Sequence, residues 1–237
     1  MSLYIKKLLA NINLPKVANA TIILSILLGG YMSKLLTIIA TPNPSEASYS
    51  QIVLNSFINS YKEANPLHTH TQINIFDIFV PEIDGDMLEA FDALNKNTPF
   101  SNLSNEQQKA LTASEELLKQ FLEHDKYVFV TPLWNASFPA RLKSYMDAMC
   151  VPRKTFNYTE KGSQGLIEGK KVVHIHSSGD YIKSVNFADA LLREILEFIG
   201  IKDVDTIFIH GHGNMPHLGE QIKEKAKNMA IELGKSF

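Results

Sequence analysis

The arrangement of apolar residues constrains this chain more than any other feature. From Lys34 to the C-terminus, apolar runs of strand length alternate with longer segments whose apolar residues recur at helical spacing. Such alternation is typical of a parallel sheet, because each parallel strand needs a long crossover to reach the next one. The expected strands are Leu35–Ala40, Ile73–Phe79, Tyr127–Thr131, Lys171–His176 and Thr206–His210. The expected helices are Ser50–Tyr61, Asn105–His124, Ala140–Met149, Phe187–Ile199 and Leu218–Leu233.

This order of elements predicts an α/β protein with a flavodoxin-like fold, a five-stranded parallel sheet with helices on both faces. Ligands of such sheets bind beyond the carboxyl ends of the strands. Two connecting regions are less regular. Residues 81–104 are expected to hold a short helix, Asp86–Leu94, and residues 151–169 carry turn residues around short β-like pieces. We expect the second region to form an excursion over the site.

Composition limits the class of protein. The chain has 237 residues, of which 45% are apolar and 20% charged, enough to bury the core of one globular domain. A formal net charge of −2 and a pI near 6.4 lack the basic surface of a nucleic-acid binder, so a small molecule is the expected partner. A single cysteine, Cys150, permits no intrachain disulfide, which fits a reducing compartment and predicts a cytoplasmic protein.

The first 31 residues are interpreted separately, as an N-terminal extension of a domain that covers residues 32–237. The apolar run Ala20–Leu28 follows three lysines and is similar to a weak secretory signal. It is too short to span a bilayer, so no stable membrane insertion is expected. Two other interpretations are that Met32 is the native initiator and that the extension forms an added surface helix. We favour Met32, because a cleavage site so close to the first strand would leave almost no spacer.

The loop after the first expected strand suits a phosphate group. It reads TPNPSEASYS and leads into a helix, with hydroxyl groups on Thr41, Ser45, Ser48 and Ser50. Hydroxyl groups and backbone amides at a helix N-terminus donate hydrogen bonds to phosphate, and the helix dipole assists them. The loop has no glycine, which argues against a dinucleotide fingerprint or a Walker A loop. The alternative is that Ser48 or Ser50 merely caps the helix.

Two more loops at the same predicted edge of the sheet have a suitable composition for a ligand. The third strand is followed by Pro132, Leu133, Trp134, Asn135 and Ala136. The fourth strand is followed by Ser177, Ser178, Gly179 and Asp180. A lone tryptophan is more often a core residue, but here it stands at the carboxyl end of a strand, where backbone groups and an aromatic ring could meet a flat ligand. Because all three loops share one edge, we expect a single site.

Several segments together resemble the FMN-dependent NADH:azoreductase and NADH:quinone oxidoreductase family. They are Ser48-Tyr49-Ser50, the PLWN turn with the helix ARLKSYMDAM, the stretch TFNYTEKGSQGLIEGKK and Phe198-Ile199-Gly200-Ile201. The resemblance covers nearly all of the chain from Met32 onward. It implies that Thr41 and Ser48 to Ser50 hold the FMN phosphate, that Leu133 to Ala136 line the isoalloxazine and that Ser177 to Asp180 close the other side. Tyr158 and Phe198 match aromatic positions at the substrate mouth of the family.

The resemblance also implies a reaction. NADH or NADPH would reduce FMN and leave, and a quinone or azo compound would then take two electrons, so no general acid or base is nominated. Members are usually homodimers with the site at the subunit interface. Two departures bear on flavin potential and on the preference for anionic dyes. Relatives often have Ser-Arg-Gly-Gly where this chain has Ser178 and Asp180, and a basic residue where it has Asn157.

Two alternatives remain open at the level of sequence. A metal site is possible in principle because His174 and His176 alternate on one expected strand, while His210 and His212 alternate at the end of the next. No cysteine or Glu-x-x-His pattern completes a ligand set, and buried histidines often have backbone or helix partners. The second alternative is a flavodoxin-like electron carrier without NADH turnover, against which the aromatic residues Tyr158 and Phe198 argue.

Overall fold

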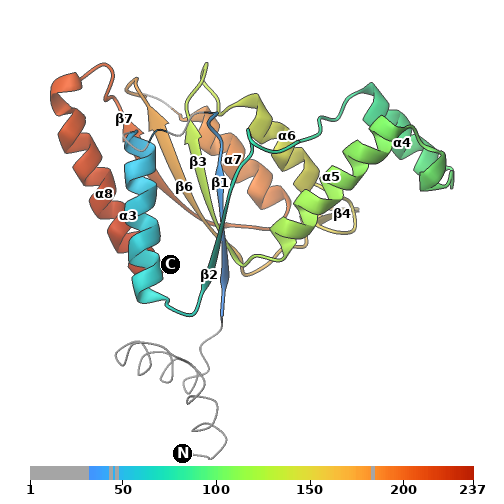
Figure 1. Ribbon diagram of the computed structural model, residues 1–237, viewed down its shortest axis with the longest axis horizontal. Coiled ribbons are helices and arrows are strands. Elements are labelled where there is room, and N and C mark those ends of the chain that lie inside the picture. Colours follow the sequence, from blue (N-terminus) through green and yellow to red (C-terminus); the bar gives the residue numbers. More distant parts are fainter. Residues whose placement is uncertain (1–31, 43–44, 46–47, 183–184) are drawn as a thin grey trace, which may run out of the picture.

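The sheet has the predicted flavodoxin-like architecture. The computed structural model describes residues 32–42, 45, 48–182 and 185–237, so the interpretations of residues 1–31 lie outside the described residues. Five parallel strands lie in the order β2-β1-β3-β6-β7 (Figure 1). In this order β1 and β3 are neighbours. The connection from β1 leads to one edge of the sheet and those from β3 lead to the other, so the switch point of the topology lies between β1 and β3. The strands are β1 (Lys34–Ile39), β2 (Thr69–Asn74), β3 (Lys126–Pro132), β6 (Lys171–Ser178) and β7 (Asp203–His210).

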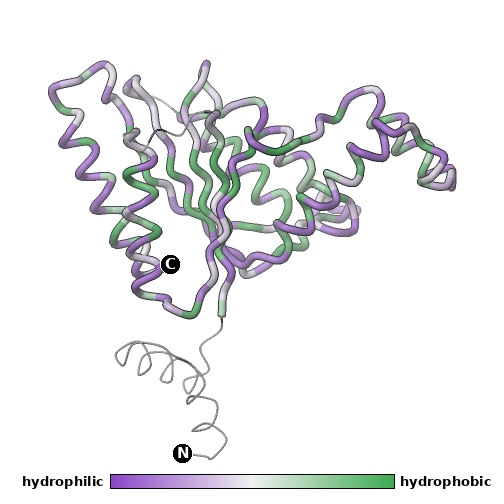
Figure 2. The backbone as a smooth tube through the Cα atoms, viewed as in Figure 1, coloured by the Kyte–Doolittle hydropathy of each residue, from purple (hydrophilic) through white to green (hydrophobic). Residues whose placement is uncertain are grey.

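Helices cover both faces of the sheet. Alternate residues of β1 point to opposite faces, so that Leu36 and Ile38 enter one core and Leu35 and Ile39 the other. The central strands are correspondingly buried along most of their length and rich in apolar residues (Figure 2). One face is covered by α3 (Tyr49–Ala64) and α8 (Gly219–Ser236), and the other by α5 (Asn105–Leu122), α6 (Ala140–Met149) and α7 (Phe187–Phe198).

The helices begin where polar side chains satisfy the first backbone amides. Ser104 and Gln107 form a reciprocal capping box at the start of α5. Asp84 caps the short helix α4 (Gly85–Asn95), so the helix expected between residues 86 and 94 is confirmed. Among the described residues, none of the helices combines the length and the apolar composition that crossing a membrane requires.

The second strand was predicted in the wrong place. It was expected at Ile73–Phe79 but lies at Thr69–Asn74, where it pairs only with β1 at the edge of the sheet. An edge strand needs no continuous apolar run, which is why the polar sequence THTQIN forms it. The Ile75 amide still donates to the Ile39 carbonyl oxygen of β1 at 3.0 Å. The chain then turns, and Phe76 packs edge-on against Trp134 with ring centroids 6.3 Å apart.

Residues 151–169, which follow α6, were expected to extend over the site. They contain a hairpin that does not cover the carboxyl edge of its own sheet. Its strands, β4 (Phe156–Thr159) and β5 (Gly162–Gly165), pair antiparallel. The Ile167 amide donates to the Ile199 carbonyl oxygen at 2.9 Å, which fastens the hairpin to the far end of α7. Because α7 runs back from the carboxyl edge, its end lies toward the amino edge of the sheet. Two short 3-10 turns, η1 (Phe100–Asn102) and η2 (Pro216–Leu218), complete the described elements.

Candidate active site at the carboxyl ends of the strands

Backbone and side-chain hydrogen bonds hold the loops at the carboxyl edge together. Leu133 donates its amide to the Ser177 carbonyl oxygen at 2.7 Å, joining the loops after β3 and β6. Gly213 donates to Gly179 at 2.8 Å, joining the loops after β6 and β7. The predicted convergence of three loops on one edge is confirmed, because parallel strands all end there. The loop after β7 is a fourth component that sequence reasoning did not include.

Ser48 marks the boundary between the first loop and α3. Its hydroxyl group accepts a hydrogen bond from the Gln51 amide at 3.3 Å and lies 3.5 Å from the Ser50 hydroxyl group. Ser48 is therefore the N-cap of α3. Thr41 lies at the start of the same loop, where its carbonyl oxygen accepts from Asn74 Nδ2 at 3.0 Å. The N-terminus of the 16-residue helix α3 places partial positive charge at this loop.

Tyr49, at the end of this loop, lies next to two basic side chains from the last part of the chain. Its ring lies 5.0 Å from the ring of His212, and Lys223 Nζ lies 5.6 Å from the ring centroid. A side chain at Gly219 would come within 2.6 Å of the Tyr49 hydroxyl oxygen, so the glycine lets α8 start beside Tyr49. His212 and Lys223 were not predicted as residues of the phosphate site. Only the fold places them beside Tyr49, which lies more than 160 positions earlier in the sequence.

The loop after β3 contains a tight, strained turn. Asn135 and Ala136 both have positive φ angles, 49° and 67°, and the amides and carbonyl oxygens of Trp134 and Ser137 exchange hydrogen bonds across them. Two consecutive left-handed residues are the signature of a type I′ turn, a conformation that asparagine adopts readily and alanine only at an energetic cost. Backbone strain of this kind is concentrated at functional sites. The turn leaves the Trp134 side chain 44% exposed.

A pocket of about 520 Å³ opens between the loops after β3, β6 and β7. It brings Leu133, Ala136 and Asp180, which were predicted, together with Asn186 and Asn214, which were not. Asp180 Oδ1 accepts from the Tyr181 amide at 2.8 Å and from Asn214 Nδ2, and the Asp180 amide donates to the Ser178 hydroxyl oxygen at 3.1 Å. Further lining residues are Tyr181, Ile182, Val185 and Phe187.

Trp134 and Asn135 line a neighbouring groove instead. This groove, of about 570 Å³, also includes Phe76 and Arg141. Arg141 donates from Nε to the Ile75 carbonyl oxygen and from Nη2 to that of Ile78, both at 2.6 Å. It thereby ties the loop after β2 to the start of α6. Nothing in the sequence reveals this partner 66 residues away.

Tyr158 and Phe198 lie together, but away from these loops. Phe156 links them, with ring centroids 5.1 Å from Tyr158 and 4.4 Å from Phe198. The Tyr158 side chain is 76% exposed on the hairpin. Within one chain, the structure therefore separates the predicted substrate-mouth residues from the predicted cofactor loops by the length of α7, roughly 18 Å for its 12 residues.

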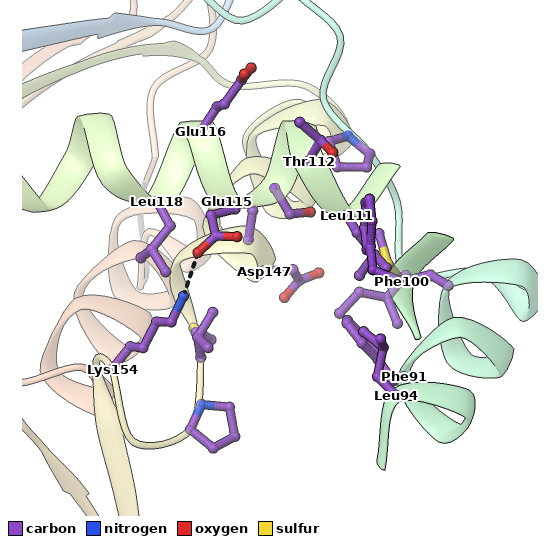
Figure 3. Close-up of a pocket in the computed structure, with 18 of the residues that line it drawn as sticks. Phe91, Leu94, Phe100, Leu111, Thr112, Glu115, Glu116, Leu118, Asp147 and Lys154 are labelled. Atoms are coloured by element: carbon purple, nitrogen blue, oxygen red, sulfur yellow. Dashed lines mark hydrogen bonds and ion pairs between the residues drawn. The ribbon is translucent and has the colours of Figure 1, made fainter. Parts of the chain in front are cut away.

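A second, mostly apolar pocket lies between α4, α5 and α6 (Figure 3). Its volume is about 870 Å³, and Lys154 bridges one side to Glu115 with an Nζ to Oε1 distance of 2.9 Å. Phe91 and Phe100 line it and are 40% and 45% exposed. None of the residues predicted for the cofactor loops lines this pocket.

The four histidines do not form a metal site in the described part of the chain. No group of three or more histidine, cysteine, aspartate or glutamate side chains among the described residues is placed to hold a metal ion. His174 and His176 both bond to the Thr131 hydroxyl group, at 2.8 and 2.7 Å. Burial lowers the pKa of His176 to about 3, so its ring is neutral at ordinary pH.

Comparison with known proteins places this arrangement in a family. Residues 33–233 match the family described as having a flavodoxin-like fold. The FMN-dependent NADH:quinone oxidoreductase of Staphylococcus haemolyticus is 41% identical over 211 residues, which cover 87% of this chain and 100% of that protein. The enzyme of the same name from Geobacillus kaustophilus is 37% identical over the same shares of both chains.

Solved structures agree with these relatives. An azoreductase from Bacillus anthracis superimposes with a TM-score of 0.79 at 31% identity, covering 87% of this chain and 100% of that one. An FMN-dependent NADH-azoreductase from the same species, solved in complex with FMN, gives a TM-score of 0.75 at 31% identity, over 86% of this chain and 100% of that one. The chain therefore belongs to the flavodoxin-like-fold family that includes the FMN-dependent NADH:quinone oxidoreductases and azoreductases.

Proposed function

We propose that this protein is an FMN-dependent oxidoreductase that uses NADH or NADPH to reduce quinones by two electrons and to cleave azo compounds to amines. One observation carries the proposal: loops after three parallel strands, β3, β6 and β7, line a pocket at the carboxyl edge of a chain that matches such enzymes along their whole length. The FMN-binding domain would comprise residues 32–237. A small-molecule substrate and a cytoplasmic location are part of the same proposal.

The residues at this edge suit FMN. Thr41, at the start of the loop after β1, and Ser48, Tyr49 and Ser50, at the N-terminus of α3, would hold the phosphate, aided by the helix dipole. Pro132 to Ala136 on one side and Ser177 to Asp180 on the other would hold the isoalloxazine, with Leu133 and Ala136 as apolar walls of the pocket. FMN itself would supply the hydride and electron transfer.

The protein groups then have three tasks, which are to bind, to orient and to exclude water. The strained Asn135-Ala136 turn presents backbone groups in a fixed direction, and Asn214 holds the Asp180 carboxylate in place. No side chain is assigned as a general acid or base. Ser178 is buried and its hydroxyl group accepts from the Asp180 amide. This loop would therefore offer a buried serine where relatives often carry an arginine, and a fixed carboxylate two residues later.

We propose a homodimer as the working form. Tyr158 is well exposed, and within one chain it lies far from the cofactor loops, so a second chain is needed to bring Tyr158 and Phe198 to a substrate bound there. The segment that contains α4 and η1, which we call the arm, stands away from the sheet (Figure 1). It exposes apolar side chains on a single molecule. Burying such side chains against a second copy would be favourable.

Flavin loading of the purified protein tests the proposed function. After addition of FMN and desalting, the protein should retain absorption bands at roughly 370 and 450 nm that bleach on anaerobic addition of NADH. Steady-state NADH consumption with a quinone acceptor then separates an oxidoreductase from an electron carrier, which would bleach without turnover. A colourless protein after desalting would overturn the proposal.

A further inference from the structure

A network of buried polar side chains lies beneath the loops of the proposed FMN site. Thr131, at the end of β3, lies at its centre, with its hydroxyl oxygen 2.8 Å from His174 Nε2 and 2.7 Å from His176 Nδ1. His174 Nδ1 lies 2.8 Å from Asp189 Oδ1, in the first turn of α7. Thr131, His174 and His176 are completely buried. Arg193 and Thr206 complete what we call the Thr131 network, with bonds to Asp189 at 2.8 and 2.7 Å.

The direction of every hydrogen bond in the network follows from Asp189. Burial favours the neutral form of its carboxyl group, but the hydrogen bonds that it accepts outweigh burial and hold its pKa below the ordinary value. An ionised carboxylate only accepts, so His174 Nδ1 carries the proton. For His174, burial has the opposite effect and lowers the pKa, so the ring is neutral and its Nε2 is an acceptor. The Thr131 hydroxyl group must then donate to His174 Nε2.

The same argument assigns the proton on the His176 ring. Having donated its only proton to His174, the Thr131 oxygen accepts from His176 Nδ1, so His176 is also protonated on Nδ1. The network ends there, since His176 Nε2 is buried and has no hydrogen-bond partner among the described residues. A chain with one consistent direction has a single low-energy arrangement of its side chains, because reversing any link would leave two donors or two acceptors facing each other.

The members of the network lie directly next to the loops after β3 and β6. Thr131 immediately precedes Pro132, and His176 immediately precedes Ser177. Asp189 follows the end of the loop between β6 and α7, three residues after the helix cap Asn186, which lines the pocket. The network therefore connects the two loops proposed to hold the isoalloxazine, and none of its hydrogen bonds reaches a described residue of the loop after β1.

We propose that Thr131 is a positioning residue, which acts through His174 and His176 to hold the β3 and β6 loops at the separation that the isoalloxazine ring requires. This inference rests on the proposed function. It assigns Thr131 a task that its place in the buried core would not by itself indicate. The sequence showed the histidines but not the threonine, because a threonine in a buried strand has no distinctive pattern.

Thr131→Val is the central variant, because valine keeps the size and branching of threonine but removes the hydroxyl group. The conservative variant Thr131→Ser keeps the hydroxyl group. Thr37→Val is a matched control: Thr37 is equally buried in the middle of β1, and its hydroxyl group also bonds to a histidine, His70 Nε2, at 2.9 Å. All three are compared with the wild type in thermal unfolding and in binding of FMN and of riboflavin, which has the ring but no phosphate.

We expect Thr131→Val to weaken FMN and riboflavin by the same factor, roughly tenfold, because only the ring-binding loops are affected. The visible circular dichroism of bound FMN should change with it. Thr131→Ser should restore both properties, and Thr37→Val should lower thermal stability while leaving flavin affinity within roughly threefold of the wild type. Equal effects of Thr131→Val and Thr37→Val on flavin affinity and dichroism would overturn the positioning role.

A measurement on the wild type keeps the proposal testable if Thr131→Val does not fold. Nitrogen-15 NMR of the histidine rings should show His174 and His176 neutral and protonated on Nδ1, and His176→Leu provides the assignment. Protonation of either ring on Nε2 instead would overturn the network. Failure of the wild type to bind FMN at all would overturn the proposed function, whereas normal binding with unaltered Thr131→Val would overturn only this inference.

Discussion

At the scale of single residues, the clearest departure from ordinary backbone geometry is Ala136. It has a φ of 67° in the turn after β3, next to Asn135 at 49°. For an alanine, the left-handed region costs about 1 to 2 kcal/mol, whereas asparagine and glycine enter it readily. The sequence PLWNA suggested a loop that contacts a ligand, but not a strained one, because the preferred partner of asparagine in a type I′ turn is glycine.

Replacing Ala136 by glycine should therefore stabilise the FMN-free protein. Glycine removes the strain but adds entropy to the unfolded chain, so we expect a net gain of about 0.5 to 1 kcal/mol in the free energy of unfolding. Urea titration followed by far-ultraviolet circular dichroism measures it. Lower stability of Ala136→Gly than of the wild type would show that the turn is not strained in solution.

The buried histidines predict how stability depends on pH. Burial lowers the pKa of His176 from 6.5 to about 3 and also lowers the pKa of His174 and His210. The unfolded chain therefore binds more protons than the folded one below pH 6.5, so stability is full above that pH and falls as the solution becomes more acidic. The lowered pKa of Asp189 has no effect in this window, because that carboxyl group stays ionised in both states above about pH 5.

Between pH 7.5 and 5.5, the burial of neutral His176 should cost about 1 kcal/mol of unfolding free energy, and His174 and His210 should add to the loss in the same direction. Urea titrations at both pH values measure the total loss, and His176→Leu should reduce it by the share of one histidine. The same pH dependence in the wild type and in His176→Leu would mean that His176 is not held neutral by burial.

At the scale of elements, the hairpin formed by β4 and β5 depends on two glycines that touch. A Cβ atom at Gly165 would lie 2.2 Å from the Gly200 backbone nitrogen, a distance that only movement of the backbone could relieve. This contact docks the hairpin, and with it Tyr158, on the end of α7. The sequence indicated short β-like pieces here, but their docking site depends on a contact between residues 35 positions apart.

Gly165→Ala should undock the hairpin from α7. The steric clash is expected to lower the free energy of unfolding by about 1 to 3 kcal/mol and to expose residues 151–169 to proteolysis. Gly85→Ala is the control, since a Cβ there meets nothing within 4 Å at the start of α4. A hairpin as resistant to protease in Gly165→Ala as in Gly85→Ala would contradict the close contact.

At the scale of the whole molecule, the arm with α4 and the apolar pocket beside it call for a partner surface. Ile83, Leu88, Phe91 and Phe100 are between 40% and 58% exposed. An apolar cluster of this kind is unfavourable in water and marks an interaction site. In the proposed homodimer it would be covered by the second chain, which would also carry Tyr158 to the site.

Phe91→Asp should shift the protein from dimer to monomer, because a carboxylate would have to be buried in an apolar interface. Sedimentation velocity measures the shift, and NADH consumption with a quinone should fall at least tenfold as the shared site is lost. Met229→Asp is the control, since Met229 on α8 is equally exposed at 40% but lies outside the arm. A monomeric wild type, or a dimeric and fully active Phe91→Asp, would contradict the proposed interface.

The sequence determined the fold class, most element boundaries and three of the four loops at the carboxyl edge. Periodic burial and helix caps such as Ser48 and Asp84 are local, and local patterns are what a sequence displays. It misplaced β2, because an edge strand carries no apolar run, and the short apolar stretch beside it belongs to a loop.

Only the tertiary structure decided which side chains meet. Arg141 with the loop after β2, His212 with Tyr49, and Thr131 with His174 and His176 are contacts between segments far apart in the chain. Each depends on the order of strands in the sheet and on the face to which a residue points. Those are properties of the whole packed core, and no short stretch of sequence encodes them.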